Sequence, residues 1–174
     1  SYHAVAAVPK HTDVSKVLDR LLRYQICLGE EIPFDGRTVL EIGAGPLLGW
    51  ALCGLALGAK KYYLLEPQFN PELLTNFDSY FKEHRRYVSR VLGPVGSLRN
   101  VMSEEHIEVI PRTGHDTGLP DKSVDLILSN SVLEHVHDIP ELVRELYRIS
   151  SPRCVQYHIV TLHDHTRGGD PFSH

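Results

Sequence analysis

Three glycines follow a short apolar run in the stretch VLEIGAGPLLG at residues 39–49. Gly43, Gly45 and Gly49 have a GxGxxxG spacing, and the carboxylate of Glu41 comes two residues before the first of them. Because glycine has no side chain, a turn of this kind lets the backbone approach a ligand closely. A glycine turn between a strand and a helix is typical of a nucleotide site, and a tight turn that binds nothing is the alternative.

The charges around this turn discriminate between ligands. No Lys, Arg, Ser or Thr occurs at residues 39–59, which excludes a P-loop for nucleoside triphosphates. Glu66 follows at the distance, about 20 residues, at which a carboxylate can hold ribose hydroxyls. Glu41 would repel a pyrophosphate, whereas it suits a cationic ligand. S-adenosylmethionine carries a ribose, a sulfonium and an ammonium group and no phosphate, so Glu41, Gly43, Gly45 and Glu66 match its needs.

Histidines and acids cluster in two further segments that can supply a base. LEHVHD (133–138) contains His135, and LHDHT (162–166) contains Asp164 and His165. Imidazole titrates near neutral pH, so His135 and His165 are the candidate general bases, and Asp164 can orient an imidazole. Structural histidines bonded to their surroundings are the alternative. We expect no metal site, because neighbouring residues such as Asp164 and His165 point to opposite faces of a strand.

The elements that must position these residues alternate along the chain. Apolar runs predict strands at 38–42, 62–66, 107–110, 124–129 and 154–162. Apolar spacing and capping residues predict helices at 13–28, 47–58 and 70–91 and another after Asp138 and Pro140. This alternation indicates an α/β fold: a doubly wound, mainly parallel Rossmann-like sheet with helices on both faces. Such sheets bind ligands beyond the carboxyl ends of their strands.

Composition limits the classes of partner. The chain has 174 residues, 42% of them hydrophobic, and a net charge of −4. This length suits one domain, and the acidic balance does not favour nucleic acid or an anionic membrane surface. Three scattered cysteines form no CxxC pair, and no apolar run approaches the roughly 18 residues of a membrane span. We therefore expect a cytoplasmic protein without a membrane partner.

The motifs together resemble those of class I S-adenosylmethionine-dependent methyltransferases. VLEIGAGPLLG (39–49) is similar to the first motif of that family, acid-x-Gly-x-Gly, and YYLLEP (62–67) is similar to the second. GHDTGLPDKSVDLILSNSVLEHVHD (114–138) resembles the third region, in which Leu-Pro and Ser-x-Asp lead into a strand. The likeness is greatest to the branch that methylates small molecules. It implies S-adenosylmethionine as the cofactor and a small-molecule methyl acceptor.

The resemblance also implies roles for individual residues. Glu66 would hold the ribose, and the two glycines that follow Glu41 would approach the methionine part of the cofactor. His115 and Asp116 fall where the family has a residue beside the adenine, and both remain candidates. Asn130 and Ser131 would line the cofactor cleft.

The end of the sequence departs from the family pattern. Family members have two more strands after the one predicted at 154–162, and too few residues follow it here. We therefore expect a helical segment at 1–37 and a methyltransferase core at 38–174 that lacks the C-terminal strands. The last strand would be an exposed sheet edge, at which a second copy can associate. Two other functions stay open: an inactive domain that binds S-adenosylmethionine or a partner, and an NAD-dependent oxidoreductase.

Overall fold

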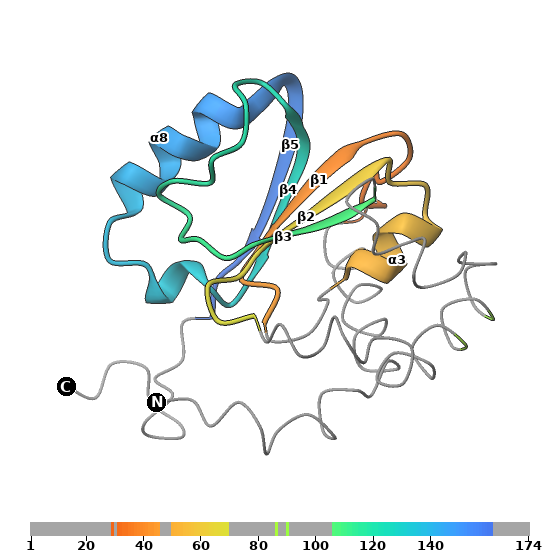
Figure 1. The fold of residues 1–174 in the computed structure, drawn as a ribbon, viewed down its shortest axis with the longest axis horizontal. Coiled ribbons are helices and arrows are strands. Elements are labelled where there is room, and N and C mark those ends of the chain that lie inside the picture. The colour runs from red at the N-terminus through yellow and green to blue at the C-terminus, as the bar shows by residue number, and fades with distance from the viewer. Residues whose placement is uncertain are drawn as a thin grey trace.

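The computed structural model describes residues 29, 31–45, 50–69, 86, 90 and 106–161. Within them, five strands form one sheet in the order β3-β2-β1-β4-β5, and every neighbouring pair is parallel (Figure 1). The elements are β1 (Thr38–Ile42), α3 (Ala51–Ala56), β2 (Lys61–Leu65), β3 (Ile107–Ile110), β4 (Val124–Asn130), the 3-10 helix η1 (Leu133–His135), α8 (Ile139–Ile149) and β5 (Ser150–Ile159). The prediction of a parallel, Rossmann-like sheet is confirmed.

β1 lies in the centre of the sheet, and its side chains are covered on both faces. Val39 pairs in register with Tyr62 of β2 on one side and with Leu126 of β4 on the other. Val39 and Leu40, which point to opposite faces, are both fully buried. The chain builds the sheet outward from β1 to β3 in one direction and from β4 to β5 in the other. The carboxyl ends of β1 and β4 therefore flank the switch point at which such sheets bind ligands.

A separate apolar core covers each face of the sheet. On one face, α3 contributes Leu52 to a cluster that contains Trp50 and Tyr62. On the other face, α8 contributes Leu142 and Leu146 to a second cluster. Figure 1 shows α3 and α8 on opposite sides of the sheet. The predicted arrangement of helices on both faces is confirmed.

α8 begins where its sequence signals predicted a start. Asp138 is the N-cap, and its Oδ1 accepts a hydrogen bond from the backbone N of Glu141 at 2.9 Å. Pro140 lies in the first turn, where a missing N–H has no helical partner to lose. The helix thus starts directly after the segment that contains the candidate base His135.

The last strand differs from its prediction. β5 spans Ser150–Ile159 and starts directly after α8, whereas the sequence predicted 154–162. Ser150 pairs with Val124, and the register then shifts, so the following residues of β5 form an irregular segment. The polar SSPR run resembles a turn in composition, and Pro152 is tolerated because this strand lies at the sheet edge. Within the described residues β5 pairs only with β4, and self-association through its free edge stays a prediction.

Some predictions lie outside the described residues. These are the helix at 13–28 and most of the helix at 70–91, of which only Arg86 and Arg90 are described, as helical and exposed.

The helix predicted at 47–58 corresponds to α3, with Trp50 as its N-cap. Just before β1, Ile32 and Phe34 already belong to the core beneath α3. Among the described helices, none has the length and hydropathy needed to cross a membrane.

Candidate functional site

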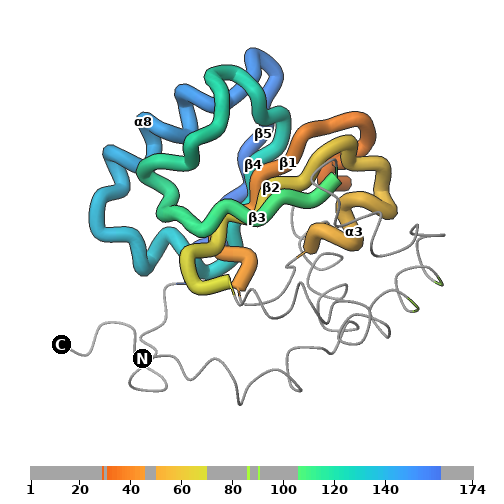
Figure 2. Tube along the Cα trace, viewed as in Figure 1, coloured from red at the N-terminus to blue at the C-terminus, as the bar shows by residue number. Residues whose placement is uncertain are grey.

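A pocket of about 280 Å³ opens at the carboxyl ends of the strands. Its walls come from the ends of β1 and β2, the β3–β4 loop, the segment after β4 and α8. The lining residues are Ile42, Gly43, Leu65, Pro67, Arg112, Thr113, Gly114, His115, Val132, His135, Val136, His137 and Leu142. Figure 2 shows the β3–β4 loop on the same side of the sheet as α8. The pocket therefore lies beside the switch point, where the topology favours a ligand.

The glycine turn forms one wall of this pocket. Gly43 has φ of 68° and Gly45 has φ of 77°, a left-handed conformation that side chains disfavour. The N of Gly43 donates to the carbonyl of Leu65 at 2.8 Å, which ties the turn to the end of β2. A Cβ on Gly43 would clash with Cγ2 of Val132, whereas a Cβ on Gly45 would meet nothing within 4 Å. The first glycine is thus required by packing as well as by its backbone angle.

This difference predicts unequal costs for two matched substitutions. Gly43→Ala should lower the free energy of unfolding by about 2 kcal/mol or more, because it combines backbone strain with overpacking against Val132. Gly45→Ala should cost about 1 kcal/mol, because it adds the strain alone. Urea denaturation of the two variants measures both values. Equal costs would mean that the contact with Val132 is easily relieved and does not fix the turn.

Glu66, directly after β2, connects the second strand to the glycine turn. Its side chain is buried, Oε2 accepts from the N of Gly45 at 2.8 Å, and Oε1 accepts from the N of Gln68 at 2.9 Å. An ionised carboxylate offers about four acceptor positions. Two backbone donors leave room for two more, so Glu66 can also accept hydrogen bonds from a pair of ligand hydroxyls.

Glu41 is also buried, but it faces the α3 side of the sheet. Its Oε2 accepts from the N of Trp50 at 2.9 Å and from the hydroxyl of Tyr62 at 2.7 Å. Burial raises the pKa of this carboxyl to about 7, and the two hydrogen bonds oppose that rise only in part. Glu41 is not among the residues that line the pocket. Its hydrogen bond to Trp50 holds the residue that starts α3, and its contact with a cofactor stays a prediction.

The β3–β4 loop separates the two candidates for an adenine contact. His115 lines the pocket, and its Nε2 lies 3.0 Å from the carbonyl of Asp138 at the start of α8. Asp116 is not a lining residue; its side chain is 78% exposed and its Oδ2 pairs with Nη1 of Arg112 at 3.3 Å. His115 is therefore the residue of this pair that a ligand in the pocket would touch.

Polar groups gather at the carboxyl ends of β4 and β5. Ser131 has φ of 53°, which is uncommon for a residue with a side chain, and such strain often marks functional sites. Its Oγ lies 2.7 Å from Oγ1 of Thr161 and donates to Oδ1 of Asn130, the last residue of β4, at 3.4 Å. Asn130 and Ser131 are thus brought together, and Thr161 joins them from the segment after β5.

Glu134 is a residue that sequence reasoning did not select. Its Oε1 accepts from the N of Thr161 at 3.3 Å, while its buried Oε2 has no hydrogen-bond partner among the described residues. Buried polar atoms in folded proteins are rarely left without a partner. The orphaned oxygen can accept a donor from a ligand. The signal available in the sequence was its place in LEHVHD, where the neighbouring histidine drew attention first.

The candidate bases are only partly described. His135 ends η1, is exposed and lines the pocket together with His137. Its role as a base stays a prediction. His165 and Asp164 lie outside the described residues. In the described part of the chain, no three His, Cys, Asp or Glu side chains come together in a way that could hold a metal ion.

The family model for the methyltransferase domain matches residues 40–155. This range is more than half of the chain and contains the glycine turn, Glu66, His115 and the end of β4. The chain belongs to this methyltransferase family.

Solved structures that share the methyltransferase fold include three of comparable similarity. An S-adenosylmethionine-dependent methyltransferase from Aquifex aeolicus is 20% identical with a TM-score of 0.51, over 97% of this chain and 74% of its own. A candidate S-adenosylmethionine-dependent methyltransferase from Methanococcus maripaludis is 16% identical with a TM-score of 0.53. The match covers 87% of this chain and 61% of the other chain. A third structure is a Haloferax volcanii complex of the Trm112 methyltransferase activator with a candidate methyltransferase. The match has 21% identity and a TM-score of 0.56, and it covers 89% of this chain and 58% of the other chain. This chain thus spans less than two-thirds of the last two. No curated protein matches the sequence significantly.

S-adenosylmethionine is the cofactor that membership of the methyltransferase family implies, and the residues present fit it. The buried carboxylate of Glu66 has acceptor positions left for ribose hydroxyls. The adjoining pocket is walled largely by apolar side chains, such as Leu65, Val132 and Leu142, which suit a flat aromatic base. The glycine turn contains no side chain that would bind a phosphate. The donor set therefore matches the adenosine part of the cofactor.

Proposed function

We propose that this chain transfers a methyl group from S-adenosylmethionine to a small-molecule acceptor. One observation carries the proposal: the buried Glu66 carboxylate bonds the glycine turn at 2.8 Å and keeps free acceptor positions beside an apolar pocket. This combination suits an adenosine moiety, with ribose hydroxyls on Glu66 and adenine between apolar walls. The family match over residues 40–155 supports the same assignment.

The remaining cofactor contacts follow from the position of each residue. His115 faces the adenine side of the pocket, and Gly43 and Gly45 let the backbone approach the methionine side. Asn130 and Ser131 lie at the end of β4, next to the glycine turn of β1 in the sheet order. When bound, the sulfonium of S-adenosylmethionine supplies an electrophilic methyl group. The protein mainly holds the acceptor in line with that group, because positioning supplies much of the rate.

Proton removal from the acceptor falls to groups after β4 and β5. His135 at the rim of the pocket is the first candidate, with His165 and Asp164 as the second pair. A neutral imidazole can take the proton of a hydroxyl or phenol near neutral pH. The orphaned oxygen of Glu134 offers a further acceptor for a donor on the substrate.

Two other functions make different predictions. An inactive binding domain would bind S-adenosylmethionine and transfer no methyl group to any acceptor. An oxidoreductase would bind NAD, whose pyrophosphate would rest on backbone N–H groups at the glycine turn. Calorimetric titration with NAD separates this last alternative from the other two.

Incubation with S-adenosylmethionine labelled in its methyl group tests the proposal. The protein is mixed with separate low-mass, protein and RNA fractions of a cell extract. Label in the low-mass fraction, and its loss in Glu66→Ala, is the expected result. Label in the protein or RNA fraction would contradict a small-molecule acceptor. Tight cofactor binding without label in any fraction would favour the inactive binding domain.

A further inference from the structure

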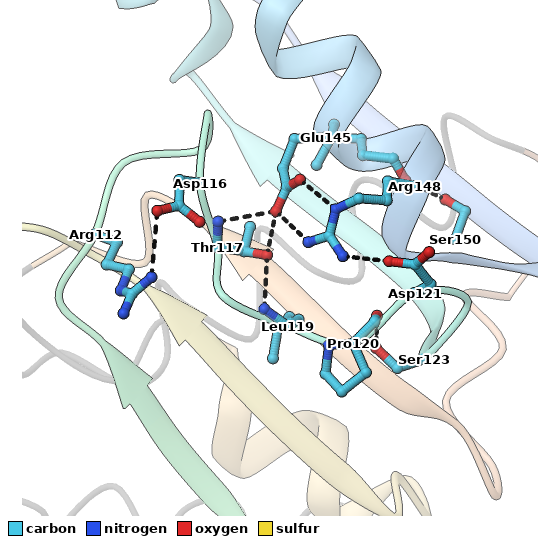
Figure 3. Close-up of polar contacts among 11 residues, drawn as sticks. Arg112, Asp116, Thr117, Leu119, Pro120, Asp121, Ser123, Glu145, Arg148 and Ser150 are labelled. Atoms are coloured by element: carbon cyan, nitrogen blue, oxygen red, sulfur yellow. Dashed lines mark hydrogen bonds and ion pairs between the residues drawn. The ribbon is translucent and has the colours of Figure 1, made fainter.

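A cluster of charged and polar side chains joins α8 to the β3–β4 loop (Figure 3). Oε1 of Glu145 accepts hydrogen bonds from both the N and the Oγ1 of Thr117, at 2.9 and 2.6 Å. Arg148, one turn further along α8, bonds both oxygens of Glu145 at 2.7 Å through Nε and Nη2. Its Nη1 also reaches Oδ1 of Asp121 at 2.6 Å. One helix therefore holds the loop at two points through a single chain of contacts.

The Thr117–Glu145 part of the cluster is better shielded from water than an ordinary surface ion pair, whereas Asp121 is exposed. Thr117 is 2% exposed, and the side chain of Glu145 is 9% exposed. Oγ1 of Thr117 also accepts from the N of Leu119 at 3.1 Å, so the threonine organises the loop around itself. Arg148 binds Glu145 through two parallel bonds, the geometry that makes guanidinium–carboxylate pairs strong.

The same loop forms a wall of the pocket a few residues earlier. Residues 112–115 line the pocket, and His115 is anchored to the carbonyl of Asp138 at the opposite end of α8. Leu142, on the buried side of α8, lines the pocket as well. Glu145, Arg148 and Thr117 do not line it. Any effect they have on a ligand must therefore pass through the position of the loop.

We propose that Glu145 and Arg148 are positioning residues for the cofactor: through Thr117 and Asp121 they hold the β3–β4 loop against α8 and thereby set the shape of the adenine side of the pocket. This inference rests on the proposed function. A wall that is already in place loses no conformational freedom when the ligand binds, which raises affinity. We call the contacts of Glu145 and Arg148 with Thr117 and Asp121 the clamp. Without the clamp, the loop has to be ordered by the ligand, and the affinity for the ligand falls.

The charge of the clamp is stable over the working range of pH. Hydrogen bonding to Arg148 lowers the pKa of Glu145 from 4.5 to about 2, and the bonds from Thr117 act in the same direction. Because the pKa in the folded state is lowered, the contribution of the clamp is fully present above the unfolded value of 4.5. It is lost as the pH falls towards 2. The clamp is therefore intact at neutral pH.

Four substitutions test the proposal. Thr117→Val keeps the shape and removes the Oγ1 donor, and Glu145→Gln keeps the shape and removes the charge. Thr117→Ser restores the hydroxyl as a conservative rescue. Glu141→Gln is the matched control, because Glu141 pairs with Arg144 at 2.6 Å on the exposed side of the same helix and touches neither the loop nor the pocket.

The measurements are the Kd for S-adenosylhomocysteine, the urea midpoint and the hydrogen exchange of individual backbone amides. We expect Thr117→Val and Glu145→Gln to raise the Kd roughly tenfold, as for a lost charge-assisted hydrogen bond. Exchange should speed up within the loop and not in the sheet. Thr117→Ser and Glu141→Gln should bind like the unmodified protein.

Each other outcome overturns the inference in a distinguishable way. If the unmodified protein binds and all four variants bind equally well, the clamp does not position the cofactor. If the urea midpoints of Thr117→Val and Glu145→Gln fall while the Kd of the folded protein is unchanged, the cluster contributes to stability alone. If the unmodified protein does not bind S-adenosylhomocysteine, the proposed function fails first and the positioning role fails with it.

Discussion

Glu66→Ala should weaken the binding of S-adenosylmethionine at least tenfold. The substitution removes the acceptor of two ribose hydroxyls, and a lost hydrogen bond to a charged group costs about 1.5–3 kcal/mol. It also removes the bond that Gly45 donates to Oε2 at 2.8 Å, so the glycine turn keeps only the backbone bond from Gly43 to Leu65 as a tie to the end of β2. The lost ribose contact and the lost bond from Gly45 both weaken cofactor binding. Isothermal titration calorimetry of the variant beside the unmodified protein measures the change in Kd.

Glu108→Ala is the matched control for this experiment. Glu108 is a carboxylate on the neighbouring strand β3, half-exposed, and pairs with Lys61 at 3.1 Å away from the pocket. Exposed pairs of this kind contribute little, so its removal should leave the Kd unchanged. Equal weakening in the two variants would show that loss of negative charge, and not loss of the ribose contact, explains the effect.

The second large effect concerns Glu41 and the pH dependence of stability. Burial raises the pKa of this carboxyl from 4.5 to about 7 in the folded protein. Because the folded value is the higher one, the folded state binds the proton more tightly, and stability falls as the pH rises from 4.5 to 7. A rise of this size corresponds to about 3 kcal/mol. Tyr62 and Cys53, whose pKa values are also raised, stay protonated throughout this interval.

Glu41→Gln should abolish this part of the pH dependence. The amide oxygen of glutamine can still accept from the N of Trp50 and the hydroxyl of Tyr62, which donate at 2.9 and 2.7 Å in the native protein. Urea denaturation at about pH 5 and about pH 8 brackets the raised pKa. Between these conditions, the free energy of unfolding should fall by about 2.5 kcal/mol more in the unmodified protein than in the variant, because part of the change occurs below about pH 5. Parallel pH profiles would show that Glu41 does not titrate in this range.

The strands of the sheet could be predicted from sequence because they are short, apolar and buried on both faces. β1 and β3 match their predicted bounds, β2 is shifted by one residue, and β4 is one residue longer than predicted. β5 was predicted four residues too late. Its first residues are polar and include Pro152, so their pairing depends on the tertiary register with β4, which composition does not encode.

Part of the candidate site could also be predicted, because some of its residues follow directly from strand ends. Gly43, Gly45 and Glu66 lie at the carboxyl ends of β1 and β2, and topology alone brings them together. The orientation of Glu41 could not be predicted, because neighbouring residues of a strand face opposite sides and either side could have been the ligand side. Its bonds to Trp50 and Tyr62 show which side it faces.

The loop between β3 and β4 was the least predictable part of the site. Sequence left both His115 and Asp116 as candidates for the adenine contact, because a loop has no periodicity from which to infer where its side chains point. Which of the two lines the pocket depends on contacts with α8, more than twenty residues away: Nε2 of His115 lies 3.0 Å from the carbonyl of Asp138. The clamp from Glu145 to Thr117 is hidden for the same reason, since its partners are 28 positions apart.

The most direct test of the central claim is a crystal structure of this chain with S-adenosylhomocysteine. We expect adenine in the pocket beside His115 and Val132, with the ribose hydroxyls within hydrogen-bond distance of the Glu66 carboxylate. Density for the ligand elsewhere, or a ligand whose ribose avoids Glu66 while the pocket stays filled by solvent, would contradict it.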